Sequence, residues 1–546
     1  MQLSPSAHLD TFTRDHLPPA DQWPGLTFAL PELAYPDRLN CAASLLDDRA
    51  AVHGADRPCV VTEHETFTYG DLVTWSNRIA QVLVEDFEIV PGNRVLLRGP
   101  NAAWLLACWA GVLKAGGVAV TTMPLLRARE ISTIGEIARV GLSLCDHRFT
   151  DDLLAADLAG APVVPYGGSG PDDLAQLMAG KSETFTACPT AADDVALLAF
   201  TSGTTGRPKA TMHLHRDVLA IGDTFSKHVL APTPDDVFSG TPPFAFTFGL
   251  GSLVVFPLHA GASTFLMEKA TPEGLVDAIE RHRISVLSTA PTMYRAMLGH
   301  LKGRDVSSLR QCVSAGETLP LATWEAFHDA TGVRIIDGIG STEMLHIFIG
   351  SSGDAIRPGS TGLPVPGYEA RVVDGRGAPV PDGEIGRLAV RGPTGCRYLA
   401  DPRQAVYVQD GWNITGDTYL RDEAGYFWYQ ARSDDMIIAS GYNIAGPEVE
   451  AALMAHPEVL ECAVIGAPDP DRGTVIKAFV VLTEGALGDD AKVRELQDFT
   501  KAQIAPYKYP RRVEFVESLP RTATGKLQRF VLREREKKAA AEKTGA

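Results

Sequence analysis

The sequence lacks several features that would place it in other classes of protein. Its eight cysteines are scattered and no two have CxxC spacing, which argues against a zinc site and gives no sign of a disulfide framework. No apolar run approaches the roughly 20 residues that span a bilayer. The N-terminal segment has neither the basic start nor the apolar core of a signal peptide. These absences predict a multidomain protein of the cytoplasm with no membrane partner.

Basic residues are also in deficit. The 50 Lys and Arg residues face 67 Asp and Glu residues, for a formal net charge of −17. A net negative surface repels nucleic acid and anionic lipid, so neither is expected as a partner. Small anionic ligands are not excluded, because they respond to local fields. The length of 546 residues predicts about two to four domains.

Alternating strand and helix patterns predict an α/β fold over most of the chain. Residues 68–84 have apolar side chains at helical spacing, 93–99 and 118–122 are predicted strands, and 102–117 is a predicted helix closed by glycines. The same alternation returns over 261–343. It predicts parallel sheets with helices on their faces.

The pattern changes twice toward the C-terminus. Short alternating strands with Gly, Pro and Asp turns over about 356–430 predict a β subdomain. Beyond it, helices and strands predict a compact α+β unit. We therefore predict a large N-terminal domain over 1–433, made of α/β subdomains plus the β subdomain, and a small C-terminal domain over 434–546. The charged segment 533–546 is expected to be a frayed, solvated end.

A run of small residues follows a predicted buried strand at 195–200. The stretch FTSGTTGRPK (200–209) combines glycines, hydroxyl side chains and one lysine. Such a run forms either a tight turn or a phosphate cradle, in which backbone N–H groups and hydroxyls converge on an anion. It lacks Walker A spacing. Composition alone leaves both interpretations open.

With further segments, this stretch resembles the signatures of the adenylate-forming superfamily of acyl-CoA synthetases, adenylation domains and luciferases. The further segments, in the family's order, are SAGETL (314–319), DGIGSTEM (337–344), ITGD (414–417), ARSDDMIIASGYNIAGPEVE (431–450) and LPRTATGK (519–526). The resemblance extends from about Thr68 to Arg529. It implies a large nucleotide-binding domain followed by a small mobile C-terminal domain.

The resemblance implies a two-step reaction that uses ATP, Mg²⁺ and coenzyme A (CoA). A substrate carboxylate attacks the α-phosphate of ATP, and pyrophosphate leaves. The CoA thiol then displaces AMP from the acyl-adenylate. Because the first step brings two anions together, positive charge along the phosphates lowers its barrier.

The resemblance also assigns roles to residues. Thr342 is expected to contact the α-phosphate, Glu343 to help hold Mg²⁺, and Lys526 to bridge the substrate carboxylate and the α-phosphate as catalytic groups. Asp417 is expected to accept both ribose hydroxyls, and Arg432 to reach the ribose or a phosphate. The other predicted ATP-binding residues lie in the phosphate and adenine segments: Thr201, Ser202, Gly203, Thr204, Thr205, Gly206, Lys209, Gly316, Glu317, Asp337, Gly338 and Ile339.

The hinge segment has a predicted role in the second step. Asp434 is the expected pivot on which the small domain swings, and Ser440, Gly441 and Tyr442 are expected to line the path of the CoA thiol. The sequence ends soon after Lys526, which favours a free thiol acceptor over a fused carrier domain. Ala431 stands where the family usually has glycine.

Each position also has a structural interpretation. Asp417 and the acidic pair at 434–435 are ordinary turn residues in other contexts, Lys526 a solvated lysine, and Glu343 a carboxylate that satisfies a helix N-terminus. His213 and His215 form an HxH pair without further ligands, so a transition-metal site is not expected.

The predicted acid-binding residues suggest a flat apolar slot: His213, Phe246, Phe248, Gly249, Ile339, Gly340 and His346. Ile339 replaces the aromatic residue that the family usually places near the adenine. FGLG and STEMLHIF resemble the benzoate-CoA ligases, and the N-terminal arm resembles 2-aminobenzoate-CoA ligases. The sequence thus favours 2-aminobenzoate, with salicylate or benzoate next, and His213 is open to a purely structural role.

Three alternatives remain at this point. The adenylate could load a separate carrier protein, could be oxidised as in luciferases, or the chain could be a non-catalytic nucleotide-binding relative. The intact Glu343, Asp417 and Lys526 set argues against the last. The oligomeric state is open, with a homodimer as one alternative.

Overall fold

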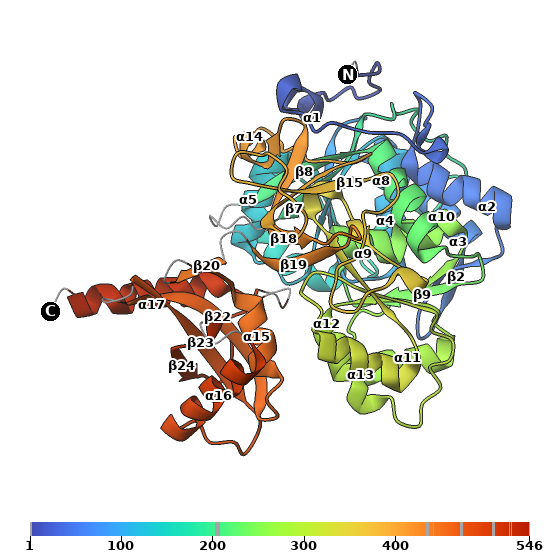
Figure 1. Ribbon diagram of the computed structural model, residues 1–546. Coiled ribbons are helices and arrows are strands. Elements are labelled where there is room, and N and C mark those ends of the chain that lie inside the picture. Colours follow the sequence, from blue (N-terminus) through green and yellow to red (C-terminus); the bar gives the residue numbers. More distant parts are fainter. Residues whose placement is uncertain are drawn as a thin grey trace. The chain divides into compact units, whose positions relative to one another are not determined.

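A computed structural model describes residues 3–201, 208–432, 436–439, 442–469, 473–504, 508–522, 525 and 527–544. The chain divides into two compact units (Figure 1). The large unit comprises residues 1–315, 323–370 and 389–414, and the small unit comprises 316–322, 371–388 and 415–546. The domain boundary after residue 433 stays a prediction, and the small unit defined by contacts begins further upstream.

A six-stranded sheet organises the first part of the large unit, in the order β6-β5-β3-β4-β7-β8. All neighbours are parallel except the last pair, β7 and β8, which is antiparallel. The strands are β3 (Arg94–Arg98), β4 (Val118–Thr122), β5 (Val140–Asp146), β6 (Val163–Tyr166), β7 (Val195–Thr201) and β8 (Lys209–Leu214).

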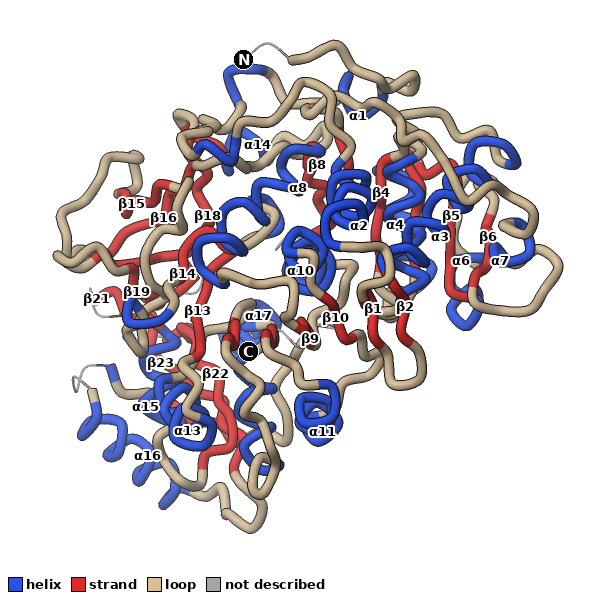
Figure 2. Tube along the Cα trace, turned by 90° about the vertical axis from the view of Figure 1, so that its right-hand side faces the viewer, coloured by secondary structure: helices blue, strands red, loops and turns tan. Residues whose placement is uncertain are grey.

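Helices lie beside the strands of this sheet (Figure 2), and their apolar side chains pack against it. The helices are α4 (Ala103–Lys114), α5 (Ala128–Ala138) and α6 (Thr150–Leu154), and α3 (Tyr69–Gln81) packs against α4. Ile131 and Ile134 of α5 join Leu96, Val120 and Leu198 of the strands in one buried cluster. After α4, Gly116 adopts φ +80°, the left-handed conformation that favours glycine.

A second, eight-stranded sheet has the order β14-β13-β12-β11-β9-β10-β1-β2. The edge strands β14 and β2 are antiparallel to their neighbours and the others are parallel. The strands are β1 (Pro58–Val61), β2 (Thr66–Thr68), β9 (Val237–Gly240), β10 (Ser263–Phe265), β11 (Val286–Thr289), β12 (Gln311–Ser314), β13 (Ile335–Gly340) and β14 (Ile347–Gly350).

Crossover helices accompany the parallel strands of this sheet: α8 (His215–Ile221), α10 (Phe256–Ala260), α11 (Pro272–His282), α12 (Pro291–Met297) and α13 (Leu321–Thr331). The start of α11 shows why it forms there. Thr271 accepts a hydrogen bond from the backbone N–H of Gly274, and Pro272 occupies the first turn, where no N–H partner is needed.

The predicted β subdomain contains a five-stranded sheet. Its strands are β15 (Glu369–Val373), β16 (Ile385–Arg391), β17 (Val408–Gln409), β18 (Trp412–Arg421) and β19 (Phe427–Arg432). β18 pairs with β16, β17 and β19. It places Asp417 directly opposite Arg432 on β19.

The C-terminal part of the small unit is built on the antiparallel pair β22–β23, whose two faces are both buried. Its elements are β20 (Met436–Ala439), β21 (Tyr442–Ala445), α15 (Gly446–Met454), β22 (Val459–Asp469), β23 (Gly473–Leu482), α16 (Asp490–Gln503), β24 (Arg512–Phe515) and α17 (Arg529–Thr544). Val464 and Ile476 pack with residues of α15 and α16. Their neighbours Ile465 and Phe479 pack with Leu532 of α17.

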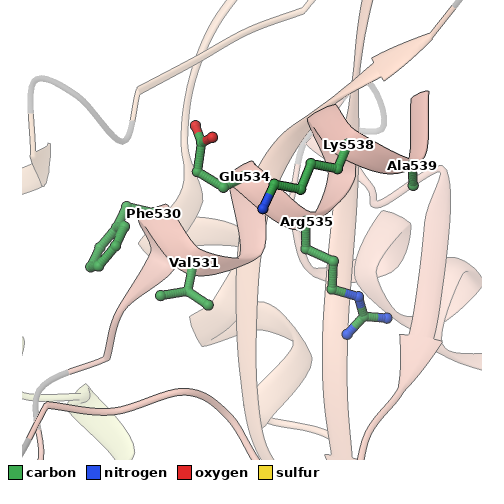
Figure 3. A pocket seen from close by; sticks show the side chains of 6 residues that line it. All are labelled: Phe530, Val531, Glu534, Arg535, Lys538 and Ala539. Atoms are coloured by element: carbon green, nitrogen blue, oxygen red, sulfur yellow. The ribbon is translucent and has the colours of Figure 1, made fainter. Parts of the chain in front are cut away.

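The expectation of a frayed end over 533–546 is wrong for the residues that the structure describes, because α17 continues to Thr544. Leu532, just before this segment, is buried against the sheet. Some charges of α17 are paired, but Glu534, Arg535, Lys537 and Lys538 are exposed, so the expectation of a solvated end holds for these side chains. Arg529 Nη2 lies 2.6 Å from Glu450 Oε2, and Glu536 accepts a hydrogen bond of 2.7 Å from Lys477. The outer face of α17 lines a surface pocket formed by Phe530, Val531, Glu534, Arg535, Lys538 and Ala539 (Figure 3).

The order of elements confirms the predicted fold class, with mixed α/β sheets followed by a separate α+β region. No helix in the described part of the chain is both long and apolar enough to cross a membrane.

Candidate active site

The phosphate-segment candidates begin and end on a β-hairpin. Thr201 at the end of β7 is the register partner of Lys209 at the start of β8. Ser202, Gly203, Thr204, Thr205 and Gly206 lie outside the described residues. The two ends of the segment are therefore adjacent, and Lys209 is fixed on a strand.

Lys209 and Glu343 meet at a buried tyrosine, Tyr398. The Lys209 Nζ donates a hydrogen bond of 2.6 Å to the Tyr398 Oη. The Tyr398 hydroxyl donates in turn to Glu343 Oε1 at 2.5 Å. Lys209 Nζ lies 3.5 Å from the same carboxylate oxygen and 4.4 Å from the centre of the Tyr398 ring. The three side chains form one cluster that joins strand β8, the turn after β13 and the segment before α14 (Gln404–Tyr407).

Thr342 and Glu343 lie on a short 3₁₀ turn, Thr342–Met344, that follows β13. Ser341 caps this turn and accepts a hydrogen bond of 3.2 Å from the backbone N–H of Met344. Thr394 donates to the Met344 carbonyl at 2.8 Å. These contacts fix the turn from both sides, so the two predicted catalytic residues sit on a supported backbone.

His213 supports the same turn. Its Nε2 lies 2.8 Å from the carbonyl oxygen of Thr342, and its Nδ1 lies 4.0 Å from Asp217. Burial lowers the pKa of His213 to about 4, so the ring is neutral near pH 7 and donates from Nε2. His215 has a different partner, with its Nδ1 3.2 Å from the Cys41 Sγ. The two histidines of the HxH pair therefore do not share a ligand.

His346 is buried within a cluster of aromatic rings. Its ring centre lies 4.5 Å from Phe256, 5.4 Å from Phe225 and 5.7 Å from Phe248. Burial lowers the pKa of His346 to about 3, so the ring is uncharged. The side chains around His346 are thus uncharged and mostly aromatic, and Phe246 and Phe248 are half-buried. Their role in an acid-binding slot stays a prediction.

The glycines of the slot allow close backbone contacts. A Cβ on Gly249 would lie 2.1 Å from the Pro243 carbonyl oxygen, and one on Gly340 would lie 2.6 Å from the His346 carbonyl oxygen. Glycine at these two positions is therefore a packing requirement. Gly338 and Ile339 lie on β13, where Ile339 pairs with Ile349 of β14.

Asp337 lies at the end of the parallel part of β13, paired with Ser314 of β12. Desolvation raises the pKa of Asp337 to about 8, against a smaller opposing effect of the Gly338 backbone. A carboxyl group with this pKa is largely protonated near pH 7 and can donate a hydrogen bond.

The predicted ribose-binding residues form an ion pair within the small unit. Arg432 Nη1 donates to Asp417 Oδ1 at 3.3 Å. The Asp417 side chain is 12% exposed and that of Arg432 is 45% exposed. Glu317, which follows Gly316 at φ +90°, lies 3.8 Å from the Arg521 guanidinium in the same unit.

Several predicted residues lie outside the described part of the chain. These are Lys526, Asp434, Ser440 and Gly441, together with the side chain of Tyr442. The backbone of Tyr442 begins strand β21 and pairs with Ala439. Their predicted roles stay predictions.

Sequence reasoning missed Tyr398 and Tyr407. The Tyr407 Oη lies 3.3 Å from Ser341 Oγ, and its ring packs edge-on against Tyr398 at 5.8 Å. Both residues follow the segment RGPTGC, between the recognised signatures. Nothing in their local sequence marks them as part of a site.

Comparison with known protein families decides the relationship. The AMP-binding enzyme family matches residues 46–398, and the AMP-binding enzyme C-terminal domain matches residues 448–526. The chain belongs to the AMP-binding enzyme family. The resemblance seen in the sequence is thereby confirmed.

Similar proteins of this family include ligases of aromatic acids. The benzoate–CoA ligase of Thauera aromatica is 35% identical over 92% of this chain and 97% of its own length. The anthranilate CoA ligase AuaEII, solved in complex with anthranoyl-AMP, has a TM-score of 0.88 and 34% identity over 94% of this chain and all of its own. A benzoate CoA ligase from Burkholderia xenovorans LB400 has a TM-score of 0.81 and 32% identity over 90% of this chain and 99% of its own. This member of the AMP-binding family is therefore grouped with the aryl-CoA ligases.

Proposed function

We propose that the protein joins a benzoate-type acid to CoA in an ATP-dependent reaction, with 2-aminobenzoate as the favoured acid. Its similarity over 94% of the chain to a ligase solved with anthranoyl-AMP supports this most directly. ATP, Mg²⁺ and CoA are the co-substrates and metal ion of the family. We further infer a cytoplasmic location, and a homodimer stays an untested prediction.

The first step forms the bond between the substrate carboxylate and the α-phosphorus, and breaks the bond from that phosphorus to the leaving pyrophosphate. Lys209 and the segment 201–206 hold the β- and γ-phosphates in this proposal, and Thr342 contacts the α-phosphate. Lys526 stabilises the negative charge that develops between acid and phosphate. Asp417, as an ionised acceptor, receives the ribose hydroxyls.

The residues around Glu343 fit a magnesium ion that arrives with the nucleotide. In the described part of the chain, no group of three or more His, Cys, Asp or Glu side chains could hold a metal ion alone. Mg²⁺ in nucleotide sites is commonly held by one or two carboxylates plus phosphate oxygens. Glu343 supplies such a carboxylate, with the hydroxyl of Thr342 beside it. The ion neutralises phosphate charge when it is bound.

The acid-binding residues are compatible with a planar ring. The apolar surface comes from Phe246, Phe248, Gly249, Ile339 and Gly340. The two glycines have no side chain that would fill the space for the ring. His346 is buried and uncharged, so it adds no charge to this apolar surface. We rank benzoate and salicylate after 2-aminobenzoate, because the N-terminal arm resembles 2-aminobenzoate-CoA ligases and a similar ligase was solved with anthranoyl-AMP.

The second step transfers the acyl group to sulfur. The CoA thiolate attacks the acyl carbon and forms a C–S bond. The bond from the acyl carbon to the phosphate oxygen breaks, and AMP leaves with that electron pair. Asp434 serves as the pivot of the small domain, and Ser440, Gly441 and Tyr442 line the thiol path in this proposal. An enzyme that loads a carrier-protein thiol would share every residue of the first step, so it is the second candidate.

Pyrophosphate release tests the proposal. The purified chain is given Mg-ATP and 2-aminobenzoate, benzoate, salicylate, phenylacetate, acetate or octanoate, each with and without CoA. We expect 2-aminobenzoate to give the highest kcat/KM and CoA to multiply the steady rate. A single stoichiometric burst that CoA does not change would favour the carrier-protein alternative. Preferential turnover of acetate or octanoate would overturn the aryl assignment.

A further inference from the structure

We propose that Tyr398 is a positioning residue that keeps Lys209 and Glu343 apart and oriented for the nucleotide and its metal ion. This inference rests on the proposed function. Lys209 and Glu343 carry opposite charges on neighbouring elements, and their charged groups lie 3.5 Å apart. Without a group between them, an ammonium and a carboxylate close to a direct hydrogen-bonded pair, which consumes both charges.

Lys209 Nζ and Glu343 Oε1 already make a long contact of 3.5 Å, and the Tyr398 hydroxyl keeps it from shortening by bonding to both partners. It accepts from Lys209 Nζ at 2.6 Å and donates to Glu343 Oε1 at 2.5 Å. Both bonds to Tyr398 involve the charged form of the other group, so they are strong and directional. The bridge commits Oε1 only. The structure gives Glu343 Oε2 no hydrogen bond from a described residue, so this oxygen keeps its lone pairs for a cation.

Backbone hydrogen bonds on both sides of Tyr398 fix the position of this residue. Met212 of β8 donates its N–H to the Arg397 carbonyl at 2.7 Å, and Leu399 donates its N–H to the Ala210 carbonyl at 2.9 Å. These bonds place Tyr398 alongside the strand that begins with Lys209. The tyrosine ring is buried and packs edge-on against Tyr407. Strand, ring and hydroxyl thus form a fixed spacer.

Calorimetric titration with α,β-methylene-ATP, with Mg²⁺ or with EDTA, measures this role without turnover. The informative quantity is the ratio of the two affinities, which we call the magnesium enhancement. In Tyr398→Phe we expect the enhancement to fall about tenfold or more, because Lys209 and Glu343 can now pair directly. A fold defect would weaken both titrations alike and leave the ratio unchanged. Tyr69→Phe is the matched control, since its buried hydroxyl bonds the backbone carbonyl of Ala262 at 2.8 Å.

A second variant decides the question even if Tyr398→Phe does not fold. Lys209→Met removes the ammonium but leaves the hydrogen bond from Tyr398 to Glu343. We expect nucleotide to bind more weakly with and without Mg²⁺, while the enhancement stays within about threefold of the wild type. Loss of the enhancement in Lys209→Met would show that the lysine, and not the tyrosine, orients Glu343, and would overturn the inference.

The outcomes also separate this inference from the proposed function. An unchanged magnesium enhancement in folded Tyr398→Phe overturns the positioning role alone. Wild-type protein that shows the enhancement but turns over no aryl acid overturns the proposed substrate class and leaves the positioning role standing. Wild-type protein with no magnesium enhancement overturns the positioning role and the metal assignment together.

Discussion

The large and small units hold their predicted nucleotide-binding charges in different ways. In the large unit, Lys209 and Glu343 are 17% and 9% exposed and share a neutral tyrosine. In the small unit, Asp417 pairs with Arg432, whose side chain is 45% exposed, at 3.3 Å. Half-exposed ion pairs contribute little to stability. The cluster in the large unit fixes Lys209 and Glu343 in place. In the small unit, Asp417 can readily exchange Arg432 for another hydrogen-bonding partner.

This difference predicts that substitutions in the large-unit cluster change the chemical step and that substitutions in the small-unit pair change nucleotide affinity.

The largest effect is expected for Glu343→Gln. It keeps the shape of the side chain and removes the negative charge that we assign to Mg²⁺. The kcat for pyrophosphate release should fall about 10²–10³-fold, as for other lost electrostatic contacts to a transition state. Thermal unfolding of the variant checks that the turn at 342–344 is intact. A kcat within threefold of wild type would mean that Glu343 does not hold the metal ion.

A smaller effect is expected for Asp417→Asn, measured as the KM for ATP. Loss of a charged acceptor for the ribose hydroxyls should raise that KM about 10–100-fold, with a lesser change in kcat. Wild-type enzyme should discriminate against 2′-deoxy-ATP, and the variant should discriminate less. Equal discrimination by the two proteins would remove the ribose role from Asp417.

Gly249→Ala tests whether the wall of the slot is as tightly packed as the large-unit cluster. The new methyl group would lie 2.1 Å from the Pro243 carbonyl oxygen, so we expect a loss of about 1–3 kcal/mol in the free energy of unfolding. Urea denaturation followed by tryptophan fluorescence measures it. Gly299→Ala is the matched control, because nothing lies within 4 Å of the added carbon.

His346→Phe tests the buried, uncharged state of this ring through the pH dependence of stability. Because burial lowers the pKa of His346 from 6.5 to about 3, its contribution is complete above pH 6.5 and is lost as the pH falls toward the folded value. Below pH 6.5 the wild-type free energy of unfolding should therefore decrease more steeply than that of the variant, by about 1.4 kcal/mol per pH unit. Parallel curves between pH 6.5 and 4 would contradict a buried neutral histidine.

Much of the fold was predictable because the residues that determine it are local. The helix over 68–84 and the strands on either side of α4 follow from apolar spacing and from glycines that permit positive φ. The tail was mispredicted for the opposite reason. Arg529, Leu532 and Glu536 acquire partners on α15 and β23, far away in sequence. Composition alone cannot reveal that a charged helix has such partners.

The candidate site likewise contains residues that local sequence predicts and one that it does not. Thr342, Glu343 and Asp417 belong to contiguous signatures, so sequence patterns suffice to nominate them. Tyr398 has no such signature, and its importance lies in contacts with residues 189 and 55 positions away. Side chains that act by supporting others become visible only when the strands that contain them are placed side by side.

Helix α17 has a consequence for the integrity of the small unit. It is the cover over Ile465 and Phe479, and β22–β23 has apolar side chains on that face as well as on the face toward α15 and α16. Removal of residues 529–544 by a protease would therefore expose Ile465 and Phe479 on this face of the sheet to solvent. Helix α17 thus shields these apolar side chains from water.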